Sequence, residues 1–245
     1  METLTFRPQQ TAASPVSKKF PFEIRVLTRD AGRAEIFALR YRAYRDAWCI
    51  PLDADEQYRD RFDDLASTVI LGAYDAGVCV GALRVNFSHA WQGSDTLPCA
   101  ERYPDVAGVK AATEGTIVEM SRLSIDPAIT NTSYRTTLYA SLLRAGFMAA
   151  QAGNVAKILL VTKPDWIRFY QYMLGFKTIG EPQIYPPSKD PVALLGGSFG
   201  DAQKHQRAQN AFFKITAEEI ASMKRAIAPA LVMPVPIEAC AKGRF

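Results

Sequence analysis

Cysteine and histidine are scarce in this chain, and their scarcity limits its chemistry. The four cysteines are far apart and form no C-x-x-C pair, and only two histidines are available to complete a ligand set. The pattern excludes a recognisable zinc site or disulfide framework, so we expect no bound metal and a reducing, cytoplasmic location. The residues concerned are Cys49, Cys79, Cys99, Cys240, His89 and His205.

Long apolar runs are also missing. No segment approaches the ~20 residues of a membrane-spanning helix, and residues 1–19 lack the apolar core of a signal peptide. Residues 1–20 follow neither helix nor strand periodicity and are predicted to be a flexible arm. The remaining chain suits one sizeable core, so we predict a single domain over residues 21–228 and a tail over 229–245.

The chain has no large excess of one charge. Subtracting 25 acidic from 29 basic residues leaves a formal net charge of +4, and the basic residues are scattered. This balance does not indicate binding to nucleic acid, and it suits a moderately acidic protein partner or substrate.

A strand over residues 116–127 interrupts its own apolar pattern with Glu119 and Arg122. Either charge buried alone would cost several kcal/mol, so both must be paired or face a cleft. Strict alternation places Glu119 with Ser121 on one face and Arg122 on the other. The two charges share a cleft only if a β-bulge intervenes, so the hypothesis includes a bulge.

Around this strand the sequence predicts a mixed α/β fold. Apolar periodicity and turn residues mark a strand, a helix, a hairpin, the central strand, a long helix, a strand, a helix and a final strand. The expected ranges are 21–29, 31–48, 68–74 with 78–87, 116–127, 133–152, 157–163, 164–174 and a strand from Phe176, with further helices at 201–213 and 217–228.

This order, together with the segment from Trp166 to Phe176, resembles the GNAT acyltransferase superfamily. Four blocks in sequence resemble acyl-homoserine-lactone synthases and the related N-acyl amino acid synthases within it. The blocks are RYRAYRDAW from Arg40, DRFD from Asp60, GALR from Gly81 and EMSR from Glu119. The resemblance implies a GNAT-like sheet with splayed central strands and an acyltransferase activity.

One departure from the superfamily concerns the acyl donor. Ordinary GNAT enzymes grip the coenzyme A pyrophosphate with a glycine-rich turn before the long helix. Residues 129–137 contain no glycine, so we expect the donor to be the acyl-phosphopantetheine of an acyl carrier protein. Its single phosphate would meet the helix N-terminus, Ser133 and Arg135.

Two further departures from the resemblance concern the acceptor substrate and the general acid. Homoserine-lactone synthases usually carry a glutamate where this chain has Tyr58, which shifts our expectation from a sulfonium acceptor to an amino acid. One extra residue before Gly175 puts Tyr170 out of register as a general acid. Lactone synthesis from S-adenosylmethionine and a non-catalytic acyl-binding module remain as alternatives.

Glu119 is the candidate general base, because an amine must lose a proton as it attacks a thioester. Arg122 and Ser121 complete the catalytic set, and backbone N–H groups where the central strands splay would hold the oxyanion. The competing interpretation is a structural ion pair between Glu119 and Arg122.

The substrate-binding candidates are arginines, acidic residues and one tryptophan. Arg84 and Arg122 would orient the acidic loop, whose carboxylates would bind the amine, unless these groups form only a scaffold. Arginines of the first helix would clamp the acceptor carboxylate, unless they form a solvated face. The residues are Arg40, Arg42, Trp48, Asp60, Asp63 and Arg84, and the acyl pocket is assigned to Met120, Leu123, Leu142, Phe147, Trp166 and Phe169.

Overall fold

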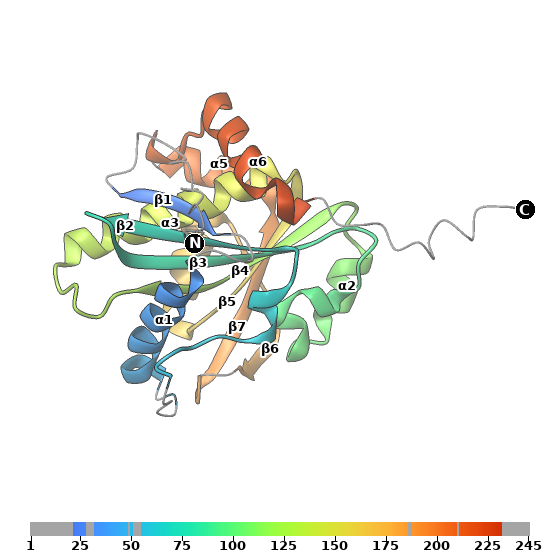
Figure 1. Ribbon diagram of the computed structural model, residues 1–245. Coiled ribbons are helices and arrows are strands. Elements are labelled where there is room, and N and C mark those ends of the chain that lie inside the picture. The colour runs from blue at the N-terminus through green and yellow to red at the C-terminus, as the bar shows by residue number, and fades with distance from the viewer. Residues whose placement is uncertain are drawn as a thin grey trace, which may run out of the picture.

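Figure 1 shows the computed structural model, which describes residues 22–27, 32–48, 50, 55–185, 188–209 and 211–231. The predicted arm over residues 1–20 lies outside this part of the chain, as do residues 232–245. The last helix continues to Leu231, beyond the expected domain end at residue 228. Among the described helices, none has the length and apolar character needed to cross a bilayer.

Seven strands form one mixed sheet in the order β1-β2-β3-β4-β5-β7-β6. All neighbours are antiparallel except β4 and β5, which are parallel. The predicted mixed α/β class is therefore confirmed. The strands are β1 Glu23–Leu27, β2 Thr68–Asp75, β3 Val78–Ser88, β4 Thr116–Ile125, β5 Val155–Thr162, β6 Lys177–Ile184 and β7 Pro191–Ser198.

Helices cover both faces of the sheet (Figure 1). Successive residues of a strand point to opposite faces of the sheet. Val69 and Leu71 pack in the cluster with α3, whereas Ile70 packs with α1, so α3 and α1 lie on opposite faces. The α-helices are α1 Arg33–Trp48, α2 Asp105–Ala111, α3 Thr132–Ala152, α4 Ile167–Leu174, α5 Phe199–Gln209 and α6 Ala217–Leu231. The described ranges also contain five short 3₁₀ helices: η1 Arg61–Asp64, η2 Ser94–Thr96, η3 Pro98–Glu101, η4 Pro164–Trp166 and η5 Ala211–Phe213.

The predicted hairpin forms between β2 and β3. Ala76 and Gly77 make its two-residue turn with φ of 46° and 83°, the left-handed conformation that tight hairpins require. Four elements were not predicted. The low-pattern excursion before β4 contains η2, η3 and α2, and β7 inserts between β5 and β6.

The bulge in β4 is present. Ala82 of β3 pairs with Ser124 and Arg84 pairs with Ser121, so Arg122 and Leu123 together stand opposite one residue of β3. Arg122 has φ of 56°, a conformation uncommon for a residue with a side chain. The extra residue brings Ser121 and Ser124 to the same face of the sheet.

The parallel strands β4 and β5 separate before either ends. Their pairing runs from Thr116 opposite Val155 to Met120 opposite Leu160. Beyond that point β4 stays paired with β3, and β5 stays paired with β7. The splayed arrangement expected at the sheet centre is therefore present, and the bulge lies beside the gap.

The sheet ends at β1 on one side and β6 on the other. β1 has five residues. β6 contains Pro182, and its pairing with β7 is interrupted between Ile179 and Gln183.

Candidate active site

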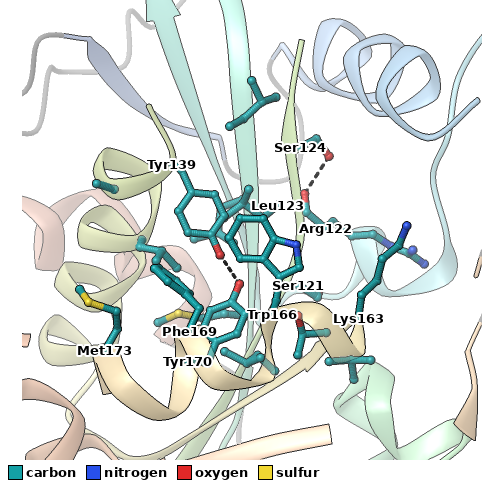
Figure 2. A pocket seen from close by; sticks show the side chains of 18 of the residues that line it. Ser121, Arg122, Leu123, Ser124, Tyr139, Lys163, Trp166, Phe169, Tyr170 and Met173 are labelled. Carbon is teal, nitrogen blue, oxygen red and sulfur yellow. Dashed lines mark hydrogen bonds between the residues drawn. The ribbon is translucent and has the colours of Figure 1, made fainter. Parts of the chain in front are cut away.

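A cavity of about 1000 Å³ opens at the gap between β4 and β5. Its walls come from both strands, from α3, α4, η4 and η5, and from a few positions of α1, β3 and β7. Figure 2 shows aromatic side chains of α3 and α4 in its middle, with Met173 at one end and the charged Arg122 and Lys163 at the other. One end of the cavity is thus apolar, and the other is polar.

Glu119 lies in the wall of this cavity without exposed surface. Its Oε2 accepts a hydrogen bond of 2.6 Å from the backbone N–H of Cys99 in η3. Its Oε1 has no hydrogen-bond partner among the described residues. Burial raises the pKa of Glu119, although the Cys99 hydrogen bonds and the nearby arginines oppose the shift. The carboxylate is thus prepared to take up a proton.

Ser121 also lines the cavity, and Arg84 fixes its orientation. The Arg84 Nε donates to the Ser121 Oγ over 3.1 Å. Because this bond uses a lone pair of the hydroxyl oxygen, the O–H remains able to donate to another group.

Arg122 reaches the cavity from the bulge. Its Nη2 donates to Asp60 Oδ2 over 2.6 Å, and its guanidinium carbon lies 5.0 Å from the centre of the Tyr58 ring. Tyr58 therefore packs against an arginine of the protein, in a cation–π arrangement. Glu119 and Arg122 line one cavity without being paired to each other, and the interpretation as their mutual ion pair is wrong.

Asp60 and Asp63 hold the arginines in place. Arg84 forms ion pairs with both carboxylates, and Arg40 pairs with Asp63 over 2.8 Å. Burial alone would raise the pKa of each aspartate, but the arginines outweigh it and hold both pKa values below the ordinary range. Neither aspartate lines the cavity, so the scaffold alternative describes them better than amine binding does.

The arginines of α1 do not reach the cavity. Arg40 has no exposed surface and is held by Asp63, so the expectation that it clamps an acceptor carboxylate is wrong. Arg42 is exposed and pairs with Asp126 over 2.7 Å outside the cavity, which also contradicts its assignment. Trp48 ends α1, and its side chain lies outside the described residues.

Four of the six residues assigned to the acyl pocket line the cavity: Met120, Leu123, Trp166 and Phe169. The other two are wrong. Leu142 packs over Gly81 of β3, and Phe147 packs 6.0 Å from the ring of Phe199. Both are fully buried core residues, because the helix periodicity that marks a buried face does not say where a cavity ends.

The sequence did not identify two tyrosines, Tyr139 and Tyr170, that line the cavity. The hydroxyls of Tyr139 and Tyr170 are hydrogen-bonded to each other, as Figure 2 shows. Tyr139 also stacks on Trp166 at 5.4 Å. Burial raises the pKa of both tyrosines. Tyr139 lies four residues before Leu143, which also lines the cavity, so the helical spacing that joins these two residues is the signal that would have found it.

Only one of the two residues assigned to the carrier's phosphopantetheine lies at the cavity. Arg135 lines the cavity, and its Nη1 donates over 2.9 Å to the carbonyl oxygen of Ile129. Ser133 is exposed and lies outside the cavity. The helix begins with Asn131, whose side chain accepts from the Tyr134 N–H, so no glycine turn precedes α3.

A mixed sheet with splayed central strands and a cavity at the gap is the fold of GNAT-type acyltransferases. The chain belongs to the N-acyl amino acid synthase FeeM family, which matches residues 35–198. It is therefore an acyltransferase of the N-acyl amino acid synthase type. No curated protein sequence matches it.

Solved structures share the fold. FeeM, an N-acyl amino acid synthase from uncultured soil microbes, is 18% identical with a TM-score of 0.61, over 77% of this chain and 97% of FeeM. BjaI, a CoA-dependent acyl-homoserine lactone synthase, is 15% identical with a TM-score of 0.55, over 83% of this chain and 99% of BjaI. The AHL synthase LasI is 16% identical with a TM-score of 0.55, over 76% and 95%.

Proposed function

We propose that this acyltransferase moves a fatty acyl group from an acyl carrier protein thioester to the amine of an amino acid. The observation that carries the proposal is the cavity itself. Its apolar part can hold a fatty chain, and its wall contains a buried carboxylate, Glu119, whose Oε1 has no partner among the described residues and could accept a proton from a reacting amine.

Glu119 would act as the general base, directly or through one water molecule. The amine nitrogen attacks the thioester carbonyl carbon, and its proton passes to Glu119 Oε1. Collapse of the tetrahedral intermediate breaks the C–S bond, and the proton moves on to the departing thiolate. The raised pKa of Glu119 suits both transfers, because a base works best when its pKa is near the working pH.

The oxyanion would be held at the gap between the strands. Beyond Met120, β4 has no partner on its β5 side, so its backbone N–H groups on that side are available to a ligand. The Ser121 hydroxyl, oriented by Arg84, is a further donor beside the same gap.

The start of α3 supports an acyl carrier protein as the donor. The Asn131 cap replaces the glycine turn that would hold a pyrophosphate, while Arg135 remains at the cavity to meet a single phosphate. A net charge of +4 favours an acidic carrier protein. BjaI is a CoA-dependent synthase, and comparing the two donors directly distinguishes the alternatives.

The acceptor carboxylate would bind to Arg122, which takes over the role expected of Arg40 and Arg42. Arg122 lines the cavity beside Ser121, and its guanidinium suits a carboxylate. Tyr58 packs against Arg122 and so is not placed to receive a sulfonium group.

Product mass decides the acceptor. The enzyme is incubated with acyl carrier protein thioester and a panel of amino acids, and in parallel with S-adenosylmethionine; free thiol and product mass are measured. We expect thiol release and an N-acyl amino acid mass, with hydrophobic or aromatic acceptors first. A lactone mass from the parallel reaction would overturn the choice of acceptor. Protection of the thioester without release would identify an acyl-binding module instead.

A further inference from the structure

Phe213 lines the cavity although it lies outside the segment that matches the family. It belongs to η5, fifteen positions beyond residue 198 where the family match ends. Its side chain is buried in the core cluster beneath α3, together with Leu143 and Met120. The C-terminal part of the chain therefore supplies a wall of the cavity.

This wall is at the apolar end. The cavity-lining residues of α3 form a helical stripe that begins with polar Thr132 and Arg135 and ends with Leu143, about 16 Å along the helix axis. The next residue, Arg144, touches η5. Glu119 faces η3 on the opposite side of the sheet from Phe213, so Phe213 closes the cavity away from the reacting groups.

Arg144 fixes the backbone on both sides of Phe213. Its Nε donates over 2.7 Å to the carbonyl oxygen of Phe212, and its Nη2 donates over 3.1 Å to that of Lys214. Arg144 has no exposed surface. A buried guanidinium that spans two carbonyls in this way leaves η5 little freedom to withdraw from the cavity.

The charge of Arg144 is in turn matched by α6. Glu219 accepts from Arg144 through both carboxylate oxygens at 2.8 and 2.9 Å. The same carboxylate accepts from the N–H of Thr216, and the Thr216 Oγ1 accepts from the N–H of Glu219, which is the reciprocal cap of a helix start. The segment that carries Phe213, and so this wall of the cavity, is therefore held by the packed core.

We propose that Phe213 determines the length of acyl chain that the enzyme accepts. The proposal rests on the proposed function, because it requires a fatty acyl chain in the apolar end. A chain that fills the cavity up to the ring gains from each buried methylene, and one more methylene meets a wall that cannot move.

Replacing the ring by a smaller side chain tests this. Phe213→Ala should shift the preferred donor to longer chains. Each additional buried methylene is worth about fourfold in kcat/KM, so two methylenes should change the long-to-short ratio about fifteenfold. Phe213→Leu, a milder change that keeps most of the packing, should shift the ratio in the same direction by less.

Phe212→Ala is the matched control. Phe212 is the neighbouring residue on η5, its ring stands 5.4 Å from that of Phe213, and it does not line the cavity. This variant should keep the wild-type chain preference. An unchanged ratio in folded Phe213→Ala and Phe213→Leu, or an equal shift in Phe212→Ala, would overturn the proposal.

A binding measurement separates this proposal from the proposed function. The melting temperature is measured with a series of straight-chain fatty acids, which requires no turnover. We expect the chain length that stabilises most to be longer for Phe213→Ala than for the wild type. If the wild type releases no thiol from any donor, the proposed function fails, while an unchanged melting series refutes the role of Phe213.

Discussion

At the scale of single residues, the role of Glu119 follows from the environment of its carboxylate and not from its residue type alone. One carboxylate oxygen is held by the Cys99 N–H and the other has no partner among the described residues. A purely structural glutamate in the core would have both oxygens satisfied, because an unpaired buried oxygen costs about 1–3 kcal/mol. The unpaired oxygen beside a cavity is the feature that favours catalysis.

Glu119→Gln tests this role with almost no change of shape. We expect turnover to fall roughly 10²- to 10⁴-fold, the usual range for loss of a general base. Circular dichroism and the melting temperature should stay near the wild-type values, since the amide can still accept from Cys99. A variant that melts early but keeps its activity per folded molecule would show a structural role.

The pH dependence of kcat/KM provides a second test of Glu119. A base must be deprotonated to act, so activity rises with pH as Glu119 ionises. Because burial raises its pKa, the acid limb should lie above the range of an exposed glutamate, whose pKa is about 4.3. Rates from pH 4 to 8 are fitted for the wild type and for Glu119→Gln. Persistence of the same limb in the variant would assign it to another group.

At the scale of elements, η1 is fastened to the sheet by charge. Asp63 has no exposed surface and lies between Arg40 and Arg84. Removing one partner leaves buried charge uncompensated, so Arg40→Met should destabilise the protein by about 3 kcal/mol. Arg42→Met, two residues along the same helix, removes an exposed pair and should cost about 1 kcal/mol or less. Urea unfolding compares them; equal losses would contradict the scaffold role.

The same network predicts how stability depends on acidity. The pKa values of Asp60 and Asp63 are lower in the folded than in the unfolded protein. Their contribution is therefore complete above the unfolded value of about 3.9 and is lost as the pH falls through the folded values. Urea midpoints should fall on acidification below about pH 4, and less steeply in Arg40→Met. Parallel curves for the two proteins would contradict this assignment.

Element order could be predicted from the sequence because period and turn chemistry are local. The β2–β3 turn and the long α3 are examples, and the bulge followed from two charges that had to share a cleft. Contacts between distant segments could not be predicted in this way. Four arginines on α1 look alike in sequence, and only the position of Asp63 decides that Arg40 is buried. Helix α2 was missed because seven residues make only about two turns, too few for its apolar pair Val106 and Val109 to stand out as a helical period.

At the scale of the whole molecule, the choice of acyl donor depends on what lies at the mouth of the cavity, where α3 begins. We expect thiol release to be at least tenfold faster with acyl carrier protein than with acyl coenzyme A of the same chain length, because α3 lacks a turn for pyrophosphate. The rates are compared at matched donor concentrations, and raised salt should slow the carrier reaction more, since its contacts are charged. Equal rates with the two donors would refute the assignment of the carrier.

The two ends of the sheet bear on how the protein behaves in concentrated solution. A long regular edge strand offers free N–H and C=O groups to any other extended chain, and such edges seed aggregation. At β6, Pro182 lacks an N–H and the break between Ile179 and Gln183 spoils the regular spacing. At β1, five residues give little length to pair with. Among the described residues, an incoming strand would therefore find a short edge at β1 and an interrupted one at β6, and both features disfavour edge-to-edge pairing between copies of the protein.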